Sequence, residues 1–225
     1  MRLLEEALSS GLPVSPILYA PERLASTAQG RALRRRLEHS AEAEEIAEPL
    51  LKSLTDTVFS QGVVAAAALP AARPVAEEGL ALVLDGIADP GNAGSMLRTA
   101  RAAGVGTVVA TQATTDLWSP KAVRAGMGAH FHLNLLLDVP WREMPLAIGQ
   151  RRLLVADARE GDPYWSVDWT RAAALVIGSE ARGPATDLPA ADRVTIPMAP
   201  GTESLNAAAS AAILLFAARR AVEAQ

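Results

Sequence analysis

The sequence predicts an α/β fold in which a parallel sheet is covered by helices, with a smaller α/β unit in front of it. From Leu80 onward, short apolar runs alternate with helical patterns, as in a chain of βαβ units. Residues 69–79 read LPAARPVAEEG, a mixture of Pro, Ala and charge that is typical of a linker. We therefore expect a small domain over 1–72, a linker over 73–79 and a larger domain over 80–225.

The small domain is expected to contain three helices and two strands. Its hydrophobic pattern predicts helices at 3–8, 30–38 and 42–50 and strands at 17–19 and 62–69, the last of them buried. The second helix carries the one clear basic run of the chain, Arg31, Arg34, Arg35 and Arg36. Guanidinium groups suit bidentate phosphate contacts, but a solvated helix face is the commoner explanation of such a run.

The larger domain is expected to alternate strands and helices as far as its closing helix. Short apolar runs predict strands at 81–84, 106–110, 130–137, 153–156, 173–177 and 194–196. Helical patterns occur at 92–103, from the Ser119-Pro120 pair onward, at 141–150 and at 205–222. Ligands of such sheets bind at the carboxyl ends of the strands, and three loops with unusual residues follow strands here.

Composition excludes several classes of protein. The chain has no Cys and only three His residues, so disulfides and thiolate metal sites are excluded, and a zinc or iron centre is not expected. No apolar run is long enough for a transmembrane helix, and the acidic start MRLLEEALSSG lacks the pattern of a signal peptide. These features fit a cytoplasmic protein with no membrane segment. The net charge of −4 does not by itself indicate a nucleic-acid binder.

The motifs of several common enzyme classes are missing from the sequence. No GxGxxG follows a strand, and GxxxxGK[ST], HExxH and GxSxG do not occur. A Rossmann-type NAD enzyme, a Rossmann-fold methyltransferase and a P-loop NTPase are therefore disfavoured.

The first unusual loop is LDGIADPGNAGSMLRTARAAG, residues 84–104. Its turn ends at Asn92, which we expect to cap the following helix. Gly94 allows close approach of another backbone or of a ligand. Arg98 lies near enough to reach back over the start of the helix. Taken alone, the loop is explained as a capped surface helix with an ordinary Arg.

The other two loops lie nearer the C-terminus. LVIGSEARGP, residues 175–184, ends a buried strand at Gly178 and continues through Glu180 and Gly183; such glycines either admit a flat ligand or merely turn the chain. IPMAPGTESLNAAASAAILLF, residues 196–216, passes from a strand through a Pro/Gly loop into an Ala/Leu-rich helix. Ser204 and Asn206 are residue types favoured at a helix start, because they accept hydrogen bonds from unpaired backbone N–H groups.

Together, in order and spacing, these loops are similar to the three motifs of the SpoU (TrmH-like) family of RNA 2′-O-ribose methyltransferases, of the SPOUT class. RAGMGAHFHLNL, residues 124–135, also resembles the family, and the resemblance covers 79–225. Residues 1–72 are similar to the small substrate-binding domain of the rRNA-modifying branch, in a shortened form. Pro184 departs from the family pattern, which more often has an apolar residue there. The resemblance implies a trefoil-knotted parallel sheet.

The resemblance also implies a cofactor and a reaction. S-adenosylmethionine would be held by the backbone around Gly178, Ile196 and Leu205, with Ser204 and Asn206 beside it. Arg98 matches the catalytic Arg of the family; because a guanidinium is too basic to act as a free base, we assign it to phosphate positioning and alkoxide stabilisation. Asn92, Ser204 and Asn206 would orient the ribose, and Glu180 would fix the local loop geometry.

Partners are implied in the same way. Members of the class generally act as homodimers, and rRNA is the expected substrate, with Arg31, Arg34 and Arg35 adding phosphate contacts. A tRNA substrate is the nearest alternative. A non-catalytic RNA-binding paralogue of the same fold is the alternative from another class, and an unrelated α/β enzyme for a small metabolite is remote because it would have to match all three motifs by chance.

Overall fold

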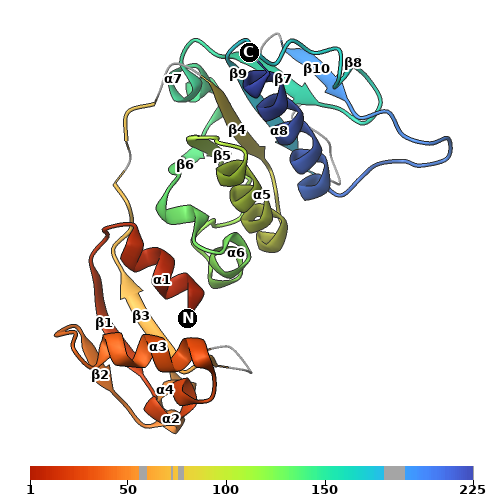
Figure 1. The fold of residues 1–225 in the computed structure, drawn as a ribbon. Coiled ribbons are helices and arrows are strands. Elements are labelled where there is room, and N and C mark those ends of the chain that lie inside the picture. The colour runs from red at the N-terminus through yellow and green to blue at the C-terminus, as the bar shows by residue number, and fades with distance from the viewer. Residues whose placement is uncertain (56–59, 72, 76–78, 180–190, 225) are drawn as a thin grey trace. The chain divides into compact units, whose positions relative to one another are not determined.

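The computed structural model describes residues 1–55, 60–71, 73–75, 79–179 and 191–224. The chain divides into two compact units, Met1–Ala71 and Ala72–Gln225. Each unit has its own sheet, shown in Figure 1. Glu180, Gly183 and Pro184 of the second motif lie outside the described residues.

The first unit is a three-stranded sheet packed against helices. Its strands are β1 (Val14–Tyr19), β2 (Ala43–Glu45) and β3 (Val63–Ala67), in the order β2-β1-β3, with β2 parallel and β3 antiparallel to β1. Its helices are α1 (Arg2–Ser9), α2 (Pro21–Ala25), α3 (Ala28–Leu37) and α4 (Glu48–Ser53). Leu33 and Leu37 are buried one turn apart on α3, which explains why the arginines between them face outward.

Two predictions for this unit are corrected. The predicted helix 42–50 is instead strand β2 followed by α4, because Pro49 lacks a backbone N–H and is tolerated only in the first turn of a helix. The residues before it pair with β1, and the Tyr19 hydroxyl donates to Glu45 over 3.0 Å. The strand predicted at 62–69 exists as β3, but it is an edge strand whose three alanines are exposed rather than buried.

The second unit is a seven-stranded sheet in which every pair is parallel, in the order β6-β5-β4-β9-β7-β10-β8. The strands are β4 (Leu80–Asp85), β5 (Thr107–Thr111), β6 (Asn134–Val139), β7 (Arg152–Ala156), β8 (Asp162–Pro163), β9 (Ala173–Gly178) and β10 (Asp192–Thr195). The helices are α5 (Pro90–Ala102), α6 (Pro120–Gly126), α7 (Met144–Ile148) and α8 (Ala207–Glu223), with 3-10 turns η1 (Ala129–Phe131) and η2 (Trp141–Glu143). The predicted α/β class with a parallel sheet is confirmed.

Helices cover both faces of this sheet. Alternate residues of β4 point to opposite sides: Leu82 and Leu84 enter the core beneath α5 and α8, whereas Ala81 and Val83 pack with α7. All four are fully buried, which explains why the central strands read as unbroken apolar runs. Within the described residues, no helix is long and apolar enough to cross a membrane.

Two predicted elements of this unit differ in detail. The strand expected at 130–137 begins only at Asn134, because His130 is fully buried in the turn η1, where its ring lies 5.1 Å from Trp118 and its Nε2 bonds the carbonyl of Leu117 over 2.8 Å. Burial also lowers the pKa of His130. The helix expected at 141–150 is the turn η2 followed by the short α7.

Gly94 makes a close contact between α5 and α6. A Cβ at this position would lie 2.3 Å from the carbonyl oxygen of Ala122 and 2.7 Å from the Cβ of Ala125. Of the two explanations for Gly94, approach of another backbone is therefore confirmed. The contact fixes α6 against the helix that carries Asn92 and Arg98.

Gly94→Ala is expected to destabilise the fold by about 1–3 kcal/mol, because the two helices must move apart to admit the methyl group. Urea denaturation of the full chain measures this loss. Gly106→Ala is the matched control: nothing lies within 4 Å of a Cβ there, so it should be neutral or slightly stabilising. Equal midpoints for the two variants would contradict the packing argument.

Candidate active site

The first and second motifs begin side by side at the carboxyl edge of the sheet. Strands β4 and β9 are neighbours, and Asp85 at the end of β4 is in register with Gly178 at the end of β9. Just beyond them, a Cβ on Gly86 would lie 3.8 Å from the Cβ of Ser179. Parallel pairing thus brings together two loops about 90 residues apart in sequence.

A buried polar network holds this edge in place. The Asp85 carboxylate accepts hydrogen bonds from the Thr111 hydroxyl and from the Trp141 indole, each over 3.1 Å. The backbone N–H of Gly86 donates to the hydroxyls of Thr111 and Thr114, each over 3.2 Å. Sequence reasoning missed this network. The only sign of it in the sequence is that two apolar strands each end in a polar residue, Asp85 in β4 and Thr111 in β5.

Asp89, not Asn92, caps the first motif's helix. The Asp89 carboxylate accepts from the backbone N–H of Asn92 over 2.8 Å and from Lys121 Nζ over 2.6 Å. The prediction of Asn92 as the cap is wrong because Pro90 takes the first helical position, which leaves the residue before it as the cap. Lys121 and the backbone N–H of Asn92 lower the pKa of Asp89.

Asn206 joins the third motif to the first. Its Oδ1 accepts from the backbone N–H groups of Ala208 and Ala209 over 3.0 and 3.2 Å. Of the two residues expected at the helix start, Asn206 is thus confirmed as the cap, whereas Ser204 lies before the first residue of the helix. The Asn206 Nδ2 donates to Asn92 Oδ1 over 3.2 Å. The first turns of α5 and α8 therefore meet, although 114 residues separate the two asparagines.

Arg98 stands apart from this pair. It is exposed on α5, six residues beyond Asn92, which corresponds to about 9 Å along the helix axis. Within the described part of the chain, its guanidinium has no hydrogen-bond or ion-pair partner. The side chain is therefore available to an external anion.

The loop between β10 and α8 offers its main chain to a ligand. Ile196 packs half-buried against the core, while Ser204 and Leu205 are exposed. Among the described residues, Thr202 is the only member of 197–205 whose backbone N–H donates a hydrogen bond, to Ala199. A loop in which most backbone N–H groups of the described residues have no intramolecular acceptor fits a cofactor held by main-chain hydrogen bonds.

The predicted RNA-contacting arginines lie on α3 in the first unit. Arg34 pairs with Glu38 over 2.8 Å, and Arg31 donates to the carbonyl of Ala25 over 2.8 Å. Arg35 is exposed. Within the described residues, no cluster of His, Asp and Glu suits a metal ion.

Comparison with known proteins decides the family. The model of the SpoU rRNA Methylase family matches residues 79–216, which is more than half of the chain. This protein belongs to the SpoU family. The three motifs on which the resemblance rested all begin within the matched segment, and the parallel sheet at whose edge they lie is the one expected of the family.

Relatives of this SpoU protein include methyltransferases of bacteria and mitochondria. It is 31% identical to the Bacillus subtilis 23S rRNA (guanosine-2′-O)-methyltransferase RlmP over 95% of this chain and 84% of that one. It is 34% identical to the mouse mitochondrial rRNA methyltransferase 3, over 63% of this chain and 46% of that one. The chain thus spans about half the length of its mitochondrial relatives.

The fold is also shared with a solved member of the family. The AdoMet complex of the SpoU methyltransferase AviRb from Streptomyces viridochromogenes superposes with a TM-score of 0.80 at 30% identity. The match covers 100% of this chain and 89% of AviRb.

The Asp89–Lys121 pair predicts a pH dependence of stability. The pKa of Asp89 is lower in the folded state than its ordinary value of 3.8. The ionised carboxylate therefore stabilises the fold at pH values above 3.8, and this stabilisation is lost as the pH falls through the pKa of the folded state. Asp89→Asn should therefore lower the urea midpoint at pH 7, and the difference from wild type should shrink below about pH 4. A difference that stays constant from pH 7 to pH 3 would contradict this assignment.

Proposed function

We propose that this protein transfers a methyl group from S-adenosylmethionine to a ribose 2′-hydroxyl in RNA, most directly in rRNA. The observation that carries the proposal is the Asn206–Asn92 hydrogen bond, which brings the first and third family motifs together at the carboxyl edge of the sheet. The names of the relatives support rRNA over tRNA, since RlmP, which matches nearly the whole chain, is named a 23S rRNA methyltransferase. For a bacterial chain, this substrate implies a cytoplasmic location.

The cofactor would be held by three segments. The backbone around Gly178, Ile196 and Leu205 would bind the adenosine part, and Ser204 and Asn206 would lie beside it. When bound, S-adenosylmethionine supplies an electrophilic methyl group on a sulfonium. The knot that the family resemblance implies would bring the segments together.

The polar residues would act on the acceptor ribose. A 2′-hydroxyl is a poor nucleophile, so negative charge that develops on its oxygen must be stabilised. Arg98 stays protonated and would bind the neighbouring phosphate and the developing alkoxide. The side chains of Asn92, Ser204 and Asn206 would orient the ribose, and Glu180 would hold its loop.

The remaining parts would deliver the RNA. Residues 1–72 would bind the substrate, with phosphate contacts from Arg31, Arg34 and Arg35, and 73–79 would link the domains. A homodimer is supported by α8, on which Ile213 and Phe216 lie one turn apart and are 36% and 47% exposed. A second copy of the chain would cover this apolar surface.

Arg98→Ala is expected to reduce methyl transfer by about 100-fold or more, because a charged donor to the developing oxyanion is lost. The assay follows radiolabelled methyl groups from S-adenosylmethionine into rRNA and tRNA from cells that lack the gene. Arg101→Ala, on the same helix, is the control and should retain activity. Calorimetry should show unchanged cofactor affinity for both variants.

Near-normal activity of Arg98→Ala would refute its catalytic role. Label in tRNA alone would favour the tRNA alternative, whereas absence of both cofactor binding and label would identify a non-catalytic paralogue.

Phe216→Glu is expected to shift the protein from dimer to monomer, because a carboxylate cannot be buried unpaired in an apolar interface. Light scattering coupled to gel filtration measures the mass. Leu146→Glu is the control, since Leu146 is 84% exposed on α7, which covers the other face of the sheet. A wild-type monomer at micromolar concentration would refute the dimer.

A further inference from the structure

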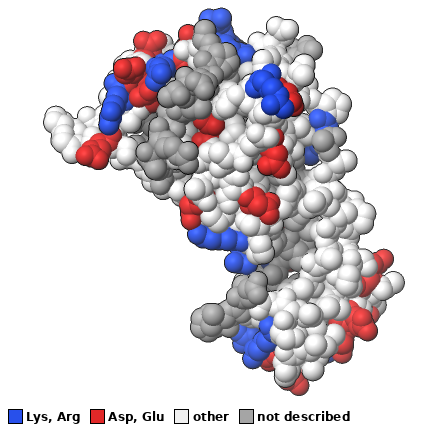
Figure 2. Space-filling model, turned by 180° about the vertical axis from the view of Figure 1, so that it is seen from behind, with Lys and Arg blue, Asp and Glu red and all other residues white. Residues whose placement is uncertain are grey.

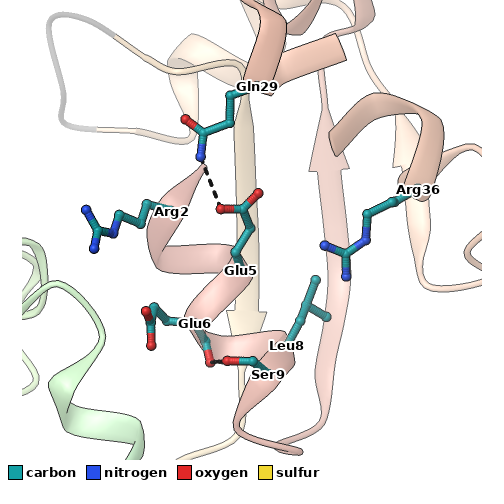
Figure 3. Close-up of a pocket in the computed structure, with 7 residues that line it drawn as sticks. All are labelled: Arg2, Glu5, Glu6, Leu8, Ser9, Gln29 and Arg36. Atoms are coloured by element: carbon teal, nitrogen blue, oxygen red, sulfur yellow. Dashed lines mark hydrogen bonds between the residues drawn. The ribbon is translucent and has the colours of Figure 1, made fainter. Parts of the chain in front are cut away.

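The first unit contains a groove between α1 and α3 that the proposed reaction does not use. The groove has a volume of about 590 Å³, and its walls include Arg2, Glu5, Glu6, Leu8, Gln29 and Arg36. Figure 3 shows the two arginines at opposite sides of the cluster, with Glu5 and Gln29 hydrogen-bonded between them. Every lining residue belongs to the first unit, so the groove is complete there.

The two arginines of the groove are exposed on the described part of the first unit. Within the described residues, neither Arg2 nor Arg36 donates a hydrogen bond or forms an ion pair, and both are exposed. Arg34 on the same helix instead forms an exposed ion pair with Glu38. The groove therefore presents two guanidinium groups that are ready to bind anions.

Between the arginines, the groove offers an acceptor and an apolar surface. Gln29 Nε2 donates to one oxygen of Glu5 over 3.1 Å, which leaves the second Glu5 oxygen as an acceptor. Leu8 is half-buried and presents a hydrocarbon surface on which a planar ring can lie. The two arginines thus provide anion sites on either side of Glu5 and Leu8, which together suit a planar group that carries hydrogen-bond donors.

We propose that this groove binds a single-stranded segment of the RNA substrate, with phosphates at the two arginines and a base between them at Glu5 and Leu8. Single-stranded RNA alternates anionic phosphates with planar bases whose edges carry N–H donors. A simple anion would gain from the arginines but would be repelled by Glu5 and Glu6. The inference rests on the proposed function only in taking RNA as the substrate.

An exposed arginine outside the groove provides a matched test. Arg36→Gln and Arg23→Gln make the same change of charge at exposed positions of the first unit, but only Arg36 lines the groove. Binding of a fluorescent single-stranded RNA to the full chain is measured by anisotropy at several salt concentrations. Arg36→Gln should weaken binding about tenfold and reduce the salt slope by about 0.7, whereas Arg23→Gln should change affinity by less than about twofold.

Glu5→Gln tests the base contact, because the two explanations predict opposite changes in RNA affinity. Removing a negative charge should strengthen RNA binding if only electrostatics matter, but loss of a charged acceptor for a base should weaken it. We expect weaker binding to ordinary RNA and stronger binding to an abasic strand of the same length. Glu22→Gln, exposed on α2 outside the groove, should not distinguish the two strands.

Equal effects of Arg23→Gln and Arg36→Gln would overturn the groove as an RNA site. Stronger binding of Glu5→Gln to both strands would overturn the base contact. Circular dichroism checks that each variant is folded, and Arg2→Gln repeats the test at the other arginine. Methyl transfer by the wild type separates the two proposals, because it can succeed while the groove variants behave like their controls.

Discussion

The hydrogen bond between Asn206 and Asn92 joins the starts of α5 and α8, and the arrangement of the candidate site depends on it. The two helices pack on the same face of the sheet, so their N-termini both lie near the carboxyl edge where β4 and β9 end. Each N-terminus carries a partial positive charge, and its cap, Asp89 or Asn206, accepts hydrogen bonds from N–H groups of the first turn. A site bounded by two such ends, with Arg98 on the same helix as Asn92, favours a negatively charged reacting group.

The position of α5 is itself set by α6 and by the polar edge of the sheet. Gly94 lets the two helix backbones come into contact, and the Lys121–Asp89 ion pair fixes the first turn of α5 from α6. The network around Asp85 holds the end of the preceding strand. The catalytic role proposed for Arg98 thus relies on residues that contact neither the cofactor nor the RNA.

The chain is acidic overall, so RNA binding must depend on local charge. On the face shown in Figure 2, Lys and Arg side chains lie in small groups interspersed with Asp and Glu. Several cations of the chain are held in ion pairs: Arg152 pairs with Asp192, and Arg193 pairs with Asp157. Cations without such partners among the described residues, such as Arg98 and Arg36, are therefore more important for binding RNA than the net charge of the chain.

The sequence by itself determined the parallel α/β class, the carboxyl-edge position of the three loops and the cap of α8, because hydrophobic periodicity and turn residues are local signals. It misplaced the cap of α5 and predicted a helix over 42–50. Both errors arise at a proline, because Pro49 and Pro90 each occupy the first turn of a helix and so fix where α4 and α5 begin. Only the tertiary structure showed that Asn206 meets Asn92, that Gly94 faces α6 and that Arg36 rather than Arg34 lines a groove. These contacts join residues that are distant along the chain or differ only in the direction of a side chain, which no local pattern specifies.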